Sequence, residues 1–99
     1  MSQGTIYHTR DGEGLLCRVQ SEPGLETAMI LFAPVMHRSY VQNTVKKLYI
    51  DCVVGGEPHL VLMTEMIALP ASDIGEAANA SRVDRDAIVT AVDLLVTGF

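Results

Sequence analysis

The sequence contains no tryptophan and only two phenylalanines among its 99 residues, so aliphatic residues and methionine supply most of its 48% apolar content. No apolar run approaches the ~18 residues that a membrane-spanning helix needs. The N-terminus lacks the apolar stretch of a signal peptide. We therefore expect a soluble, cytoplasmic protein with no membrane partner. A chain this small and apolar leaves apolar surface uncovered, which favours an oligomer.

Cysteine is also scarce. Cys17 and Cys52 lie far apart in apolar, strand-like runs and do not form a Cys-x-x-Cys pair. Two isolated cysteines indicate neither a disulfide framework nor a zinc site. We expect two buried free thiols, as is usual in a reducing compartment.

Basic residues are too few for a nucleic-acid-binding surface. The chain carries seven lysines and arginines against twelve acidic residues, a formal net charge of −5. Residues 1–50 carry a net charge of +1 and residues 51–99 a net charge of −6. This balance argues against direct, sequence-independent binding of nucleic acid. The acidic second half favours a protein partner.

No catalytic or cofactor motif is present. The glycines at 12–14 and 55–56 are not followed by the Lys-Ser/Thr pair of a phosphate-binding loop. His8, His37 and His59 lack the spacing of metal ligands. An exposed arginine beside an acid could cleave RNA, but no arginine is marked for that role. We therefore expect no metal, no cofactor, no catalytic residue and no enzymatic activity.

The chain length and the order of expected elements indicate one domain, residues 1–99. Two strand-like runs flank Gly55-Gly56, which predicts a tight hairpin because such a turn needs positive φ angles. Residues 22–24 are a break, 37–43 are irregular and 72–80 form a turn or a short helical piece. The expected strands cover residues 5–9, 15–21, 29–35, 47–54, 58–66 and 67–71.

The last segment predicts a helix. Ile88, Val92 and Leu95 follow helical spacing, and Ser81 through Asp84 resembles a capping box. Gly98 stands where a glycine ends a helix. Strands followed by one C-terminal helix predict an α+β domain with a small antiparallel, barrel-like sheet.

The tail Thr97-Gly98-Phe99 allows two interpretations. A terminal aromatic residue after a helix-ending glycine either packs into its own core or projects as a contact for a partner. The residues themselves leave both open.

Several blocks of the sequence, taken in order, resemble the CcdB family of toxins from toxin–antitoxin modules. The resemblance covers nearly the whole chain, with a shorter loop at residues 10–14. Its blocks are Val19-Gln20-Ser21, the run from Lys47 through the Gly55-Gly56 hairpin, Met63-Thr64-Glu65-Met66, residues 69–76 and the helix from Asp86 onward.

The resemblance implies a strongly bent antiparallel sheet of the SH3-like barrel type, an accessory hairpin and a long C-terminal helix. It implies a homodimer whose helices lie near the two-fold axis. Such toxins bind the A subunit of DNA gyrase and trap the enzyme on cleaved DNA, without being enzymes. A CcdA-like antitoxin neutralises them, and the complex represses its own operon by binding operator DNA through the antitoxin.

By this resemblance the gyrase-binding residues are Gly98, Phe99, Asp93 and Thr97. Gly98 matches the family pattern and Phe99 keeps a bulky apolar end. Thr97 stands where familiar members carry tryptophan, and Asp93 where they carry asparagine. Two alternatives follow: a homologue that binds its antitoxin and regulates its operon without poisoning gyrase, or a MazF-like endoribonuclease, because that fold is shared.

Overall fold

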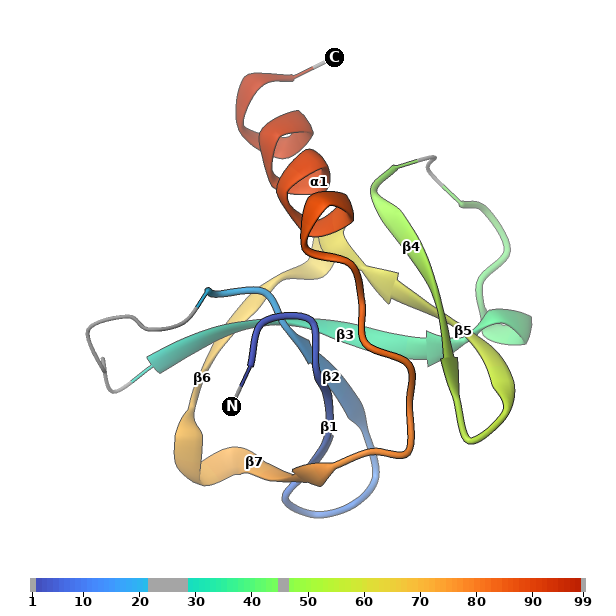
Figure 1. Cartoon of the computed structure of the whole chain (residues 1–99), viewed down its shortest axis with the longest axis vertical. Helices are drawn as coiled ribbons and strands as arrows, with labels where there is room; N and C mark the ends of the chain where they lie inside the picture. Colours follow the sequence, from blue (N-terminus) through green and yellow to red (C-terminus); the bar gives the residue numbers. More distant parts are fainter. Residues whose placement is uncertain (1, 22–28, 45–46, 99) are drawn as a thin grey trace.

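The computed structural model describes residues 2–21, 29–44 and 47–98 (Figure 1). Within these residues, seven strands precede the C-terminal helix α1 (Arg85–Thr97), which confirms the expected α+β class. Three single-turn 3₁₀ helices connect strands: η1 (Arg38–Tyr40), η2 (Met63–Glu65) and η3 (Ala71–Asp73). The strands are β1 (Ile6–Thr9), β2 (Leu15–Arg18), β3 (Met29–His37), β4 (Tyr49–Val54), β5 (Glu57–Leu62), β6 (Ile67–Pro70) and β7 (Ile74–Ala77).

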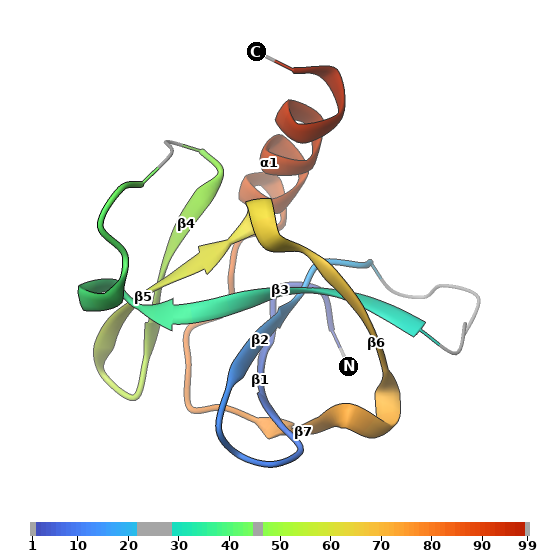
Figure 2. The same cartoon turned by 180° about the vertical axis from the view of Figure 1, so that it is seen from behind.

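All strands join one antiparallel sheet in the order β4-β5-β3-β2-β1-β7, and β6 pairs with β3. The long strand β3 pairs with β2, β5 and β6, so it connects the hairpin of β4 and β5 to the rest of the sheet. The sheet bends strongly, as Figures 1 and 2 show, and it is not closed. The predicted bent sheet with an accessory hairpin is confirmed.

Alternating side chains build a core on each face of the sheet. Along β3, Phe32 belongs to a cluster with Tyr7 and Leu16, whereas Ala33 and Val35 face the opposite side. The second cluster is larger and includes both cysteines, Val61 and two residues of α1. Alternation of this kind is the period-two pattern of a strand that is covered on both faces. No helix among the described residues is long and apolar enough to cross a membrane.

The Gly55-Gly56 hairpin forms as predicted, with φ angles of 57° and 78° in its turn. Both cysteines are free and buried, as expected. The strand β7 was not anticipated, since residues 72–80 were expected to form a turn or a helical piece. Gly75 explains its presence, because a Cβ there would lie 2.9 Å from the carbonyl oxygen of Thr9 in the neighbouring strand. The expected break at residues 22–24 lies outside the described residues.

The helix starts later than the capping-box interpretation predicts. The hydroxyl of Ser81 accepts a hydrogen bond from the Val53 N–H at 3.0 Å, and the Ser81 N–H donates to the Val53 carbonyl at 2.9 Å. Val83 N–H donates to the Gly4 carbonyl at 2.8 Å. Because these groups bond to other strands and turns, the backbone stays extended until Asp84, which is the N-cap residue. The prediction that Ser81 caps the helix was therefore wrong.

We predict that Gly4→Ala lowers the free energy of unfolding by about 2–4 kcal/mol. Gly4 has a φ of 82°, and an added Cβ would overlap the carbonyl oxygen of Val83. Gly12 is a matched control, because its φ is 78° but no atom lies within 4 Å of an added Cβ. Urea unfolding of both variants measures the difference. If both variants lose the same free energy of unfolding, the overlap with Val83 does not contribute to the destabilisation.

Candidate functional site

Helix α1 is anchored to the domain at one end and stands free at the other. Its first half buries Ile88 and Ala91, which are 1% and 0% exposed, against η2 and β4. Toward its end the helix loses this cover, and Val96 is 78% exposed. Figures 1 and 2 both show α1 rising away from the sheet with the C-terminus at its far end. The buried half therefore fixes the direction in which the exposed half projects.

Helix α1 carries two different surfaces outside the face that packs on the domain. At 100° per residue, Val89, Val92 and Val96 fall on one side of the helix, and we call them the valine stripe. Val89 is 40% exposed and Val92 is partly buried. The adjoining side is polar and consists of Asp86, Thr90, Asp93 and Thr97, all of which are exposed; we call them the polar stripe. An apolar and a polar surface on one helix can contact two different partners.

The structure brings three of the four expected gyrase-binding residues together in the last turn of α1. The hydroxyl of Thr97 donates a 2.6 Å hydrogen bond to the Asp93 carbonyl, so these two residues are neighbours on the polar stripe. Gly98 has a φ of 80° and its N–H donates to the Leu94 carbonyl at 3.0 Å. Gly98 thus ends the helix as predicted. Phe99, the fourth residue, lies outside the described residues.

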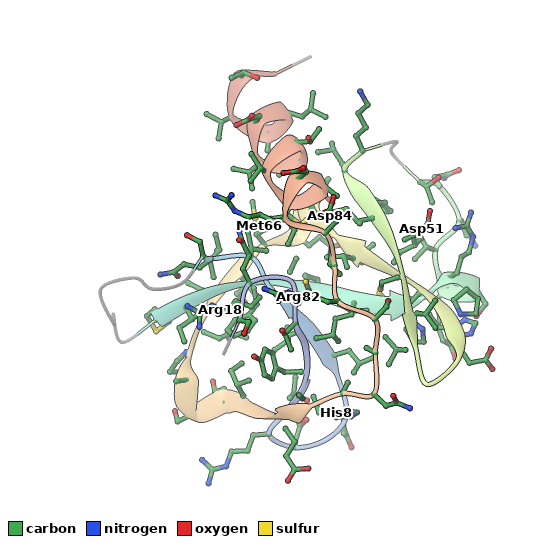
Figure 3. All side chains as sticks on the ribbon, viewed as in Figure 1. His8, Arg18, Asp51, Met66, Arg82 and Asp84 are labelled. Carbon is green, nitrogen blue, oxygen red and sulfur yellow. The ribbon has the colours of Figure 1, made fainter. Side chains whose placement is uncertain are left out.

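A second feature is a hollow of about 470 Å³ between β4 and the first turn of α1. Asp84 at the base of α1 and Asp51 on β4 both line it (Figure 3). Asp86 and Lys47 also line it. Asp51 is paired with Arg38 at 2.6 Å, but Asp84 and Asp86 still outweigh Lys47, so the hollow is negatively charged. An acidic peptide would be repelled here, whereas a cationic side chain would not.

Neither cysteine is a reactive nucleophile. Burial raises the pKa of the Cys17 thiol to about 12, and the neighbouring Cys52 adds to this shift. Burial, together with the charge of Asp51, raises the pKa of the Cys52 thiol to about 11. The thiolate is the reactive form of cysteine, and at neutral pH its population at these two positions is negligible.

Metal-binding clusters of three or more His, Cys, Asp or Glu side chains are absent from the described part of the chain. The end of α1 projects from the sheet (Figures 1 and 2), and Val96 there is 78% exposed.

Comparison with known proteins identifies one family. The family model described as CcdB protein matches residues 3–98, which is almost the whole chain. No curated protein matches the sequence.

Proposed function

The chain belongs to the CcdB protein family and is therefore a toxin of a toxin–antitoxin system, and we propose that it poisons DNA gyrase. In this proposal it binds the gyrase A subunit and traps the enzyme on cleaved DNA. It acts by binding alone and performs no chemistry of its own. The single observation that carries the proposal is the exposed end of α1, where Asp93, Thr97 and Gly98 lie together on a helix anchored at its base.

The anchored helix suits a contact with a large enzyme. A projecting tip can enter a concave surface that a flat sheet cannot reach. Because Ile88 and Ala91 hold the base of α1, little conformational freedom is lost when the tip binds. Interfaces take most of their affinity from a few such well-placed residues.

The valine stripe supports a homodimer. Val89, Leu95 and Val96 are exposed apolar residues of α1, and Val89 and Val96 lie on one side of the helix. Two copies that pair these stripes around a two-fold axis would bury the same residues on both sides. Each copy would keep its polar stripe and its tail free, so the dimer would offer two gyrase contacts.

The other proposed partners are those that membership of the family implies. We propose a cognate antitoxin that removes the toxin from gyrase, and repression of the shared operon by the complex, with operator DNA contacted through the antitoxin. The hollow beside α1 is negatively charged, so we expect it to repel acidic segments of the antitoxin.

The test is a gyrase cleavage assay. Purified protein is incubated with the host's gyrase, ATP and supercoiled plasmid, and detergent and protease then release trapped DNA. Linear DNA supports the proposal. Its absence, with protein that is folded, contradicts gyrase poisoning.

A second candidate is a homologue that binds its antitoxin without poisoning gyrase. It is favoured by Thr97, whose hydroxyl is bonded to the helix backbone and which offers no aromatic ring. It is also favoured by the negative charge of the exposed Asp93. Antitoxin binding without linear DNA in the cleavage assay would support this candidate.

We predict that Thr97→Trp raises the affinity for the gyrase A subunit by about thirtyfold, which corresponds to ~2 kcal/mol. The ring would add a large apolar contact at the exposed end of the polar stripe. Thr90→Trp is a matched control, since Thr90 lies two turns earlier on the same stripe. Surface plasmon resonance measures both variants. If Thr97→Trp raises the affinity for gyrase no more than Thr90→Trp does, the gyrase contact lies elsewhere.

A further inference from the structure

Two histidines that are 22 positions apart in the sequence lie opposite each other in the sheet. His37, at the end of β3, pairs directly with His59 of β5. Directly paired residues in an antiparallel sheet project to the same face. The two imidazole centroids are 5.0 Å apart, and the ring planes are inclined by 70°. Both side chains are half-buried, so the rings are held in place but remain reachable from solvent.

Each ring uses its Nδ1 atom for a local hydrogen bond. His59 Nδ1 lies 2.9 Å from the carbonyl oxygen of Glu57, which can only accept, so Nδ1 carries the proton and Nε2 keeps a free lone pair. His37 Nδ1 lies 2.8 Å from the hydroxyl of Ser39. The same Nδ1 atom accepts a hydrogen bond from the Ser39 N–H at 3.1 Å, so in the metal-free protein Nδ1 holds the lone pair and Nε2 carries the proton. A metal ion can bind Nε2 only after that proton moves to Nδ1, where the Ser39 hydroxyl can accept its hydrogen bond. In metal-bound histidines, the ring nitrogen that does not bind the metal usually forms a hydrogen bond, and this bond fixes the orientation of the ring.

The distance between the rings also fits a shared ion. With a metal–nitrogen bond of about 2.1 Å, an imidazole centroid lies about 3.2 Å from the metal. Two such rings have centroids about 4.6 Å apart at a right angle and about 5.2 Å apart at the tetrahedral angle. The observed 5.0 Å lies between these values. The inclination of the planes is no obstacle, because each ring can rotate about its own metal–nitrogen bond.

The surrounding charges do not oppose a cation. The nearest arginine in the sequence, Arg38, forms a 2.6 Å ion pair with Asp51. This ion pair offsets part of the positive charge of Arg38.

We propose that His37 and His59 chelate one divalent transition-metal ion through their Nε2 atoms. Imidazole ligands suit Ni²⁺, Cu²⁺ and Zn²⁺, whereas Mg²⁺ and Ca²⁺ prefer oxygen ligands. No third His, Cys, Asp or Glu of the described segments completes the group, so water fills the other coordination positions. The ion would join the end of β3 to the hairpin of β4 and β5. This site lies apart from α1 and does not depend on the proposed action on gyrase.

Titration calorimetry of the full-length, untagged protein with NiCl₂ tests the proposal. Asparagine is the informative replacement, because its amide can occupy the place of the Nδ1 half of the ring but has no Nε2. In His37→Asn the amide oxygen can still accept from the Ser39 N–H, which His37 Nδ1 does at 3.1 Å. In His59→Asn the amide N–H can still donate to the Glu57 carbonyl. His8→Asn is the matched control, since His8 is exposed on β1.

We expect one Ni²⁺ per chain for the natural protein and for His8→Asn. Each of the other two variants should bind Ni²⁺ at least tenfold more weakly, because a single imidazole forms no chelate. Circular dichroism confirms that the variants are folded. Electron paramagnetic resonance of bound Cu²⁺ should show two equivalent nitrogen ligands. Undiminished binding by either variant, or a Cu²⁺ spectrum with one nitrogen, would overturn the proposal.

Discussion

Deletion of Gly98 and Phe99 is expected to abolish gyrase trapping and growth arrest while the domain stays folded. Gly98 is exposed, and a Cβ added to it would meet no atom within 4 Å. Its one backbone bond described in the structure is the N–H to the Leu94 carbonyl. The loss of that bond costs about 1 kcal/mol at most. Gly98 therefore contributes little to stability, and in the proposed function it forms part of the contact with gyrase.

The expected size of the effect follows from the nature of interface contacts. The few residues that dominate an interface contribute ~2 kcal/mol or more each, so two of them account for at least about a thousandfold in affinity. The gyrase cleavage assay should show linear DNA with the full chain and none with the truncated chain at the same concentration. Thermal unfolding of the two proteins should give midpoints within a few degrees of each other.

Tyr40→Ala is a suitable control for the truncation. Tyr40 is a 76% exposed aromatic residue in η1, remote from α1 in sequence. Its replacement removes an exposed aromatic ring from another part of the surface and should leave gyrase trapping intact. If the truncated protein still traps gyrase, the tail is not the contact, and the proposed mechanism fails while the family assignment stands.

Replacing Val89 and Val96 together by aspartate is expected to convert a dimer into a monomer. The two side chains lie on the same side of α1, two turns apart, and are 40% and 78% exposed. A pair of valine stripes around a two-fold axis would bring four carboxylates together in an apolar interface. Unpaired buried charges cost several kcal/mol, which corresponds to a loss of at least a thousandfold in the dimer constant.

Sedimentation equilibrium measures the dimer constant directly. Thr90→Asp is the matched control, because it adds a carboxylate to the polar stripe and should not change the constant. Since both valines are exposed, the double variant should keep its fold, which circular dichroism checks. A double variant that dimerises like the natural protein would show that the valine stripe is not the interface. A natural protein that is a monomer at micromolar concentration would contradict the homodimer itself.

Local sequence signals predicted the elements whose conformation depends on neighbouring residues. Gly55-Gly56 indicated a hairpin turn because both positions need positive φ angles, and the structure has them. Gly98 indicated the end of the helix for the same reason, with a φ of 80°. The apolar spacing of Ile88, Val92 and Leu95 predicted the helix itself.

The local sequence signals gave wrong predictions where a residue contacts a segment that is distant in the sequence. Serine is a common helix N-cap residue, but the hydroxyl and N–H of Ser81 are hydrogen-bonded to the backbone of Val53, which is 28 positions away. The strand β7 lacks the apolar alternation of a typical strand, and it forms because Gly75 allows the backbone to approach β1 closely. Neither partner is visible from neighbouring residues.

The sequence alone determined the class of fold, the family and the identity of the expected tail residues, because these depend on composition, local turn chemistry and the order of motifs. Only the tertiary structure decided where α1 is anchored and which of its residues stay exposed, since that depends on how the sheet bends beneath it. The pairing of His37 with His59 was likewise decided by the register of β3 and β5. Strand register is set by long-range pairing of apolar faces, and it cannot be predicted from the spacing of two histidines along the chain.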